Sequence, residues 1–385
     1  MLAEFLELVR HLYNEHPVLL HRPIFQGNEK RYLSECIDSN FVSSVGARVT
    51  EFEEKIAAYL GVKHAIATMN GTAALHVALQ LAGARRGDEI ITQALTFVGT
   101  CNSIAYTGAE PVFVDVDRST LGMSAEALKN FLTRLVKVRD GHSYNQTTGR
   151  RIAACVPMHT FGHVCNINEI ISICEEFHIP VVEDAAEALG SRLNGKHAGT
   201  FGLLGILSFN GNKIITTGGG GMILTNDTAL AARAKHLTTT AKVAHPYEYA
   251  HDEIGYNYRM PNLNAALGCA QLERLDAFLS KKRELAGKYR EFFKGSGIAF
   301  VVEPQGCRSN YWLNAVVFES LAERNQFLEF TNSRGVATRP IWKLMSDLDI
   351  FKHYQNDGLP NSRWLEERVV NIPSSVPLIG AGRVS

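Results

Sequence analysis

Short apolar runs alternate with helical patterns between about residue 50 and residue 235. The apolar runs cover residues 65–68, 89–92, 111–114, 152–157 and 180–183. Strands that alternate with helices in this way are typical of a largely parallel sheet covered by helices. Residues 72–82 are rich in helix formers and follow Asn70-Gly71. We therefore expect a helix to begin there, with the amides of its first turn available to bind a phosphate.

The pattern changes in other parts of the chain. Residues 1–10 place apolar side chains at helical spacing, and residues 133–151 are charged and rich in turn formers, which indicates a surface excursion. A long helical pattern runs from residue 264 to about residue 293, and shorter mixed elements follow it. We expect a large domain over residues 1–245, with an N-terminal helical segment, and a smaller C-terminal domain over residues 246–385.

Composition narrows the class of protein. With 385 residues, 45% of them hydrophobic, the chain can bury a large core, and its 39 lysines and arginines balance 39 aspartates and glutamates, so no overall charge favours nucleic acid. Seven scattered cysteines with no Cys-x-x-Cys pair indicate reduced thiols. The N-terminus has no basic leader, and no segment approaches the ~20 apolar residues that span a bilayer. We expect a cytoplasmic protein without membrane or nucleic-acid partners.

The candidate chemistry centres on one lysine and one aspartate. Lys213 lies between the polar segment 208–212 and the glycine run 218–221, downstream of Asp184. A lysine amine can form a Schiff base with the aldehyde of pyridoxal phosphate, while a carboxylate can keep the pyridine nitrogen protonated. Because Asp184 follows the apolar residues 181–182, we expect it at the carboxyl end of a parallel strand, where open α/β sheets bind ligands. An aspartate that caps a helix is the alternative interpretation.

Three segments resemble the DegT/DnrJ-type sugar aminotransferases, and the resemblance covers nearly the whole chain. They are the lysine segment 208–221, Glu183-Asp-Ala-Ala186 and Asn70-Gly-Thr-Ala-Ala74. This resemblance implies an aspartate-aminotransferase-like α/β fold, pyridoxal phosphate fold type I. It also implies that the large domain holds a mostly parallel seven-stranded sheet and that a smaller C-terminal α/β domain follows.

The same resemblance implies roles for individual residues. Lys213 would form a covalent aldimine with pyridoxal 5'-phosphate and, with Asp184 at the pyridine nitrogen, would be catalytic. The remaining cofactor-binding residues would be Ser208, Gly71 and Thr72 at the phosphate, Phe97 stacked on the pyridine, Glu187 and His159 near the ring, and Asn257 of a neighbouring subunit at the phosphate. The last role requires a homodimer with shared active sites.

Some of these residues also have ordinary structural interpretations. Phe97 could belong to the core, and Glu187 could be a glutamate in the first turn of a helix. His159 and His163 are four residues apart, as in a helical metal pair, but Phe161-Gly162 between them argues against a helix and therefore against a metal site.

One branch of the family resembles this chain most at 40–46, 157–163 and 210–213. That branch aminates the C4 keto group of UDP- or GDP-linked 6-deoxy-N-acetylhexosamines on routes to legionaminic acid or bacillosamine. The implied reaction takes the amino group from L-glutamate and gives a 4-amino-4,6-dideoxy sugar nucleotide for surface glycans. Gly219 stands where many family members have glutamate, which enlarges or neutralises one wall of the site.

Three other functions compete with aminotransfer. Residues 190–196 fit the first seven places of a nucleotide-binding loop, but His197 stands where that loop needs serine or threonine for magnesium. A sugar dehydratase of the same fold would carry histidine in place of Lys213. A non-catalytic regulatory protein that binds pyridoxal phosphate would keep Lys213, Asp184 and Ser208, and amino-group turnover with glutamate distinguishes it from an enzyme.

Overall fold

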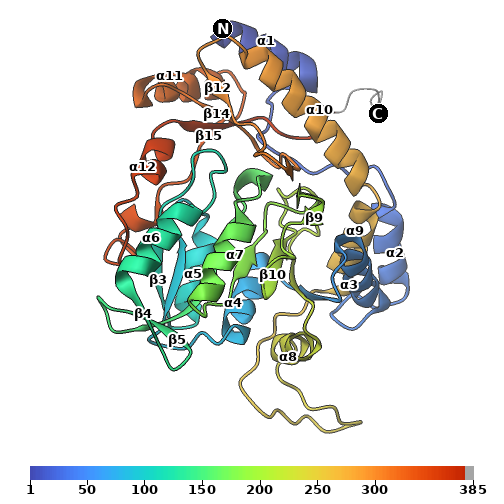
Figure 1. Cartoon of the computed structure of the whole chain (residues 1–385). Coiled ribbons are helices and arrows are strands. Elements are labelled where there is room, and N and C mark those ends of the chain that lie inside the picture. The colour runs from blue at the N-terminus through green and yellow to red at the C-terminus, as the bar shows by residue number, and fades with distance from the viewer. Residues whose placement is uncertain (378–385) are drawn as a thin grey trace.

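Seven paired strands form the central sheet of the molecule, and helices pack around it (Figure 1). The computed structural model describes residues 1–377. Its strands are β1 (His64–Thr68), β2 (Glu89–Gln93), β3 (Glu110–Val114), β6 (Arg151–Val156), β7 (Val182–Asp184), β10 (Leu204–Ser208) and β11 (Gly221–Thr225). Pairing gives the orders β3-β2-β6 and β7-β10-β11-β1, and parallel bridges at Cys155–Val181 and Met158–Asp184 join β6 to β7. Among these seven strands, only β11 runs antiparallel to its neighbours. The expected mostly parallel sheet is confirmed.

Both faces of this sheet are buried, which explains why its strands appear in the sequence as continuous apolar runs. Ile90 packs in the cluster that contains α4 (Gly71–Leu81), α5 (Val98–Tyr106) and α8 (Thr228–Thr238). Its neighbour Ile91 points to the opposite face, where α6 (Ala125–Leu135) and α7 (Ile167–Glu176) pack. Successive residues of a strand point to opposite faces, so each strand needs apolar residues at almost every position.

The excursion predicted over residues 133–151 contains regular structure. Helix α6 continues to Leu135, and β4 (Val136–Arg139) and β5 (His142–Asn145) then form an antiparallel hairpin, of which β5 pairs with β6. Charged and turn-forming side chains are tolerated because most of the hairpin is exposed. The segment is therefore at the surface, as predicted, but it extends the sheet.

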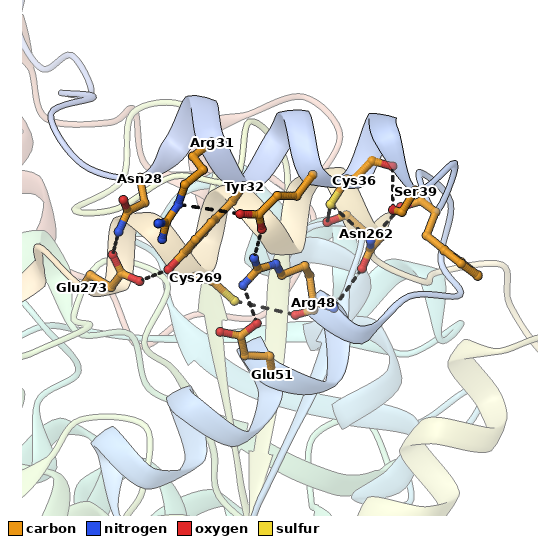
Figure 2. A network of polar contacts seen from close by, with 12 residues as sticks. Asn28, Arg31, Tyr32, Cys36, Ser39, Arg48, Glu51, Asn262, Cys269 and Glu273 are labelled. Atoms are coloured by element: carbon orange, nitrogen blue, oxygen red, sulfur yellow. Dashed lines mark hydrogen bonds and ion pairs between the residues drawn. The ribbon is translucent and has the colours of Figure 1, made fainter.

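Helices near the N-terminus pack on a helix from the C-terminal third of the chain (Figure 2). They are α2 (Glu29–Asp38) and α3 (Ala47–Leu60), and their partner is α9 (Asn262–Leu272). The Arg48 guanidinium lies 3.9 Å from the Tyr32 ring centre and pairs with Glu51, and the Tyr32 hydroxyl donates to Glu273 at 2.6 Å. Asn262 Oδ1 accepts from the Arg48 amide at 3.0 Å. These contacts join three separate segments.

The single helix predicted from residue 264 to about residue 293 is wrong. The structure has two helices, α9 and α10 (Leu275–Phe293), with a break at Glu273-Arg274. No glycine or proline marks the break, because tertiary packing causes it. Helix α9 packs on α2 and α3, whereas the C-terminal part of α10 packs with α1 (Leu2–Tyr13) and the C-terminal sheet.

A smaller antiparallel sheet lies beside α1, α10 and α11 (Leu321–Asn332). Its order is β12 (Ala299–Phe300), β14 (Asn314–Val317), β16 (Val369–Ile372) and β15 (Arg339–Pro340). Phe5 of α1 packs against Phe327 of α11 with ring centres 5.1 Å apart, so the N-terminal helix covers elements from the end of the chain. The domain boundary at residue 245 stays a prediction.

The remaining elements are short. They are β8 (Arg192–Leu193), β9 (Lys196–His197), β13 (Cys307–Arg308), α12 (Pro360–Glu366) and the 3-10 turns Thr160–Gly162 and Met345–Asp347. Over residues 1–377, none of the helices has the length and apolar character needed to cross a bilayer.

Candidate active site

A cavity opens at the carboxyl ends of the central parallel strands. Asp184 ends β7, Ser208 ends β10, and α4 begins just after β1. The predicted site residues that line this cavity are Gly71, Thr72, Phe97, Asp184, Glu187, Ser208 and Lys213. His159 and Asn257 are not among the lining residues. The sheet topology thus brings together residues from four separate segments of the chain.

Lys213 lies in the loop between β10 and β11. The loop is held at its base, where the Thr217 amide donates to the Phe209 carbonyl at 3.0 Å, and by α9, where Asn264 Nδ2 donates to the Thr217 carbonyl at 2.7 Å. Lys213 Nζ lies 3.3 Å from Glu187 Oε1 and 4.0 Å from the centre of the Trp312 ring. The amine is therefore fixed between a carboxylate and an aromatic face.

Asp184 is a buried carboxylate whose protein partners are few. Thr100 Oγ1 donates to Oδ2 at 2.8 Å, and the Ala186 amide donates to Oδ1 at 3.1 Å. Burial raises the pKa of Asp184, while these two hydrogen bonds and the charge of Lys213 oppose the rise. A cation in the cavity would stabilise this carboxylate, and a protonated pyridine nitrogen is such a cation.

Glu187 is buried as well and contacts the amine directly. Its Oε2 accepts from the Phe161 amide at 2.9 Å, and its Oε1 faces Lys213. Burial raises the pKa of Glu187 to about 7, and the charge of Lys213 limits the rise. This carboxyl group therefore keeps its proton to a higher pH than an exposed glutamate does, next to the lysine. It is not an ordinary exposed helix glutamate.

The start of α4 and the end of β10 form a cradle. Asn70 caps the helix, because its Oδ1 accepts from the Ala73 amide at 2.7 Å. The first amides of a helix have no partner within the helix and carry partial positive charge. A Cβ at Gly71 would lie 3.0 Å from Ser208 Cβ and would crowd the space between the two elements. Glycine, helix amides and a serine hydroxyl fit a phosphate group.

Phe97 is not part of the core. Its side chain is 53% exposed and borders the cavity at the start of α5, so the core interpretation is wrong.

His159 is fully buried outside the cavity lining. Its Nε2 lies 2.9 Å from Glu183 Oε2, and Glu183 also accepts from the amides of Gly199, Phe201 and Gly202. Burial alone lowers the pKa of His159, but its contacts with Cys165 and Glu183 raise the pKa to about 10. The predicted absence of a helix between His159 and His163 is confirmed, since a 3-10 turn with a positive φ of 55° at Phe161 separates them.

Asn257 lies on the exposed surface. Its Oδ1 accepts from Nε and Nη2 of Arg259 at 3.0 and 2.9 Å, and within this chain it does not line the cavity. Within the segment before it, 241–255, the exposed residues 242–250 project from the body of the molecule (Figure 1). Tyr247 and Tyr249 in this segment are 79% and 82% exposed.

Several lining residues were not predicted from the sequence. Thr100 orients Asp184, Trp312 lies next to Lys213, and Trp342 also lines the cavity. Trp312 Nε1 donates to the Asn212 carbonyl at 2.6 Å, immediately before the lysine. No sequence motif marks the two tryptophans, because they reach the cavity from distant, irregular segments.

The nucleotide-binding loop considered for residues 190–196 has a different structure. Residues 192–197 form the short antiparallel hairpin β8–β9, which pairs with β13. In the described chain this segment lacks the strand–loop–helix arrangement that a phosphate-binding loop requires.

The fold and the cavity together define a pyridoxal-phosphate-dependent enzyme of fold type I. The chain belongs to the DegT/DnrJ/EryC1/StrS aminotransferase family, whose sequence pattern matches residues 23–381. It is thus a pyridoxal-phosphate-dependent sugar aminotransferase, as the resemblance implied.

Individual relatives agree with this assignment. The chain is 37% identical over 356 residues to a GDP-perosamine synthase of Escherichia coli O157:H7, and the match covers 92% of each chain. Among solved structures it is similar to the aminotransferase TlmJ from Streptoalloteichus hindustanus, with a TM-score of 0.84, 28% identity and 93% of each chain covered. It is also similar to DesI crystallised with its TDP-sugar product, with a TM-score of 0.82, 26% identity and coverage of 93% of this chain and 88% of DesI.

Proposed function

We propose that this enzyme transfers an amino group from L-glutamate to the C4 keto group of a nucleotide-linked 6-deoxyhexos-4-ulose. The product would be a 4-amino-4,6-dideoxy sugar nucleotide for surface glycan synthesis. The observation that carries the proposal is the placement of Lys213 against Glu187 in the cavity that Asp184 and the start of α4 also line.

Each of these residues has a task that its surroundings support. Bound pyridoxal phosphate supplies an aldehyde that carries the amino group and a ring that accepts electrons. Lys213 would attach it and, once released, would move a proton to and from the substrate carbon as general base and acid. Asp184 would hold the proton on the pyridine nitrogen. Glu187, with a pKa of about 7, can exchange a proton with Lys213 Nζ at 3.3 Å.

The phosphate and the ring would be held by the remaining lining residues. Gly71, Thr72 and Ser208 form the cradle described above, and Phe97 provides an exposed aromatic face at the cavity. His159 does not line the cavity, but it would support the site by holding Glu183, the residue before Asp184.

The keto-sugar substrate is supported by the relatives and by the shape of one wall. GDP-perosamine synthase, by its name, makes a GDP-linked sugar, and DesI was crystallised with a TDP-sugar. A Cβ at Gly219 would have only the Met69 carbonyl within contact, at 3.8 Å, so the wall there has room for substrate. We propose a GDP- or UDP-linked sugar. The proposed substrates include sugars that carry an N-acetyl group at C2, as on the legionaminic acid or bacillosamine routes.

A homodimer would complete the site. Asn257 lies outside the cavity of its own chain and next to the projecting segment 241–255, so a partner subunit could use it at the phosphate. Exposed apolar side chains at Phe41, Val42 and Val45, on the surface segment after α2, support an interface between copies.

A panel of keto sugars tests the proposal. The purified enzyme with pyridoxal phosphate and L-glutamate is offered GDP- and UDP-linked 4-keto-6-deoxyhexoses with and without an N-acetyl group at C2. Mass spectrometry should detect one aminated sugar nucleotide and an equal amount of 2-oxoglutarate. Formation of 2-oxoglutarate without any aminated sugar from the panel would refute the keto-sugar class, and absence of turnover with glutamate would favour the regulatory alternative.

A further inference from the structure

Lys282 is a completely buried lysine in the middle of α10. Its Nζ lies 3.0 Å from His21 Nε2 and donates to the carbonyls of Trp312 at 3.1 Å and Ser374 at 2.5 Å. Burial lowers the pKa of Lys282 to about 7. A buried amine is costly unless every donor finds an acceptor, and these three acceptors match the three N–H bonds of an ammonium group.

The three acceptors come from three segments that are distant in the sequence. His21 lies between α1 and α2, Trp312 precedes β14, and Ser374 follows β16. The Ser374 segment is tied further, because its amide donates to the Leu20 carbonyl at 2.7 Å and its hydroxyl accepts from the Asn314 amide at 2.8 Å. Lys282 therefore sits at the point where these segments meet.

One of the three segments leads directly to the cavity. Lys282 holds the backbone carbonyl of Trp312, while the indole of Trp312 donates to the Asn212 carbonyl and presents its face to Lys213 Nζ. Burial lowers the pKa of His21. His21 is also close enough to both lysines that the charges of Lys282 and Lys213 lower this pKa further. A continuous set of contacts thus connects Lys282 with the amine at the cavity.

We propose that Lys282 is a positioning residue for Lys213 and acts through Trp312. This inference rests on the proposed function, because it concerns the lysine that attaches the cofactor. Fixing the Trp312 backbone fixes the indole, and the indole holds both the residue before Lys213 and the amine itself. A displacement of a reacting group by about 1 Å can slow a reaction by about 100-fold.

The experiment separates positioning from packing. Four full-length proteins are stripped of cofactor: the wild type, Lys282→Met, Trp312→Phe and the double variant. The probe for chemistry is pyridoxal phosphate, and its rate of covalent capture on Lys213 is followed by borohydride trapping and peptide mass mapping. The probe for binding is pyridoxamine phosphate, which cannot attach to lysine. Lys288→Met is the matched control, since Lys288 lies on the exposed face of the same helix.

We expect Lys282→Met to slow capture about tenfold while the affinity for pyridoxamine phosphate changes less than twofold. The double variant should be no slower than Trp312→Phe alone, because Lys282 acts through the indole that Trp312→Phe removes. Lys288→Met should capture at the wild-type rate. Capture by Lys282→Met at the wild-type rate, or losses that multiply in the double variant, would overturn the inference.

A second variant keeps the inference testable if Lys282→Met does not fold. His21→Phe removes one acceptor of Lys282 and leaves the lysine in place. It should slow capture without weakening pyridoxamine phosphate binding, and a wild-type rate would count against the inference. A wild-type chain that captures no pyridoxal phosphate would overturn the proposed role of Lys213 itself, which is a different result.

Discussion

Asp184 carries a charge that the protein balances only in part. Its carboxylate is buried and receives two hydrogen bonds, from Thr100 and the Ala186 amide. If a protonated pyridine nitrogen is its partner, Asp184→Asn keeps the shape and loses the charge. We expect both half-reactions to slow by about 100-fold, with cofactor binding partly retained.

Single-turnover kinetics with L-glutamate and then with a keto sugar measure the two halves separately. Asp227→Asn is a suitable control, because Asp227 caps α8 and does not line the cavity. Full activity of Asp184→Asn would refute the role of this carboxylate.

The raised pKa of Glu187 predicts that the stability of the cofactor-free protein depends on pH. Its pKa is raised by burial from an ordinary value of 4.5 to about 7. Between these values the unfolded chain has lost a proton that the folded chain keeps, so the free energy of unfolding falls as pH rises through this window. Glu187→Gln removes the effect. Relative to wild type, the cofactor-free variant should gain stability between pH 5 and pH 8, by up to about 3 kcal/mol.

Denaturant titrations of the cofactor-free proteins at pH 5 and pH 8 measure this difference. Glu291→Gln, at a glutamate that is 77% exposed, should show no such change. An equal stability difference between Glu187→Gln and wild type at both pH values would contradict the assignment.

At the scale of elements, the start of α4 serves both the fold and the site. Asn70→Ala removes the cap and should cost about 1 kcal/mol of stability. Ser124→Ala removes the equivalent cap of α6, where Ser124 Oγ accepts from the Ala127 amide at 3.1 Å. Both variants should lose similar stability, but only Asn70→Ala should weaken binding of pyridoxamine phosphate. Equal affinities in the two variants would argue against a phosphate site at α4.

The elements that the sequence predicts well are those whose pattern has a local cause. The central strands are buried on both faces, so their apolar runs stand out, and Asn70-Gly71 marks the start of α4. The break between α9 and α10 has no local signal. Glu273 at the break accepts hydrogen bonds from Asn28 and Tyr32, which lie at the start of α2 and are distant in the sequence. The β4–β5 hairpin is exposed, and its charged residues resemble a loop.

The candidate site divides in the same way. Lys213, Asp184 and Glu187 belong to motifs and lie in one cavity as expected. Trp312 and Trp342 could not be predicted, because tertiary packing alone brings them there: Trp312 contacts α10 and the lysine loop, and Trp342 packs against Phe161. The role of Lys282 could not be predicted for a related reason, since a lysine in a long charged helix normally faces solvent.

At the scale of the whole molecule, the proposed dimer makes a quantitative prediction. If each site combines Lys213 of one chain with Asn257 of the partner, Lys213→Ala and Asn257→Ala should each be nearly inactive alone. After mixing and exchange of subunits, half of the dimers are hybrids with one intact site of two. Activity should then recover to about a quarter of the wild-type value. Native mass spectrometry, with one variant isotopically labelled, counts the hybrids, and no recovery among verified hybrids would refute the shared site.

The central claim is that Lys213 attaches pyridoxal phosphate and exchanges an amino group with L-glutamate. The most direct test is the visible absorption spectrum of the purified protein, loaded with pyridoxal phosphate and freed of unbound cofactor. It is recorded before and after addition of L-glutamate, for the wild type and Lys213→Ala. We predict a band that glutamate bleaches in the wild type and that Lys213→Ala lacks. A glutamate-sensitive band that persists unchanged in Lys213→Ala, or no band in either protein, would contradict the account.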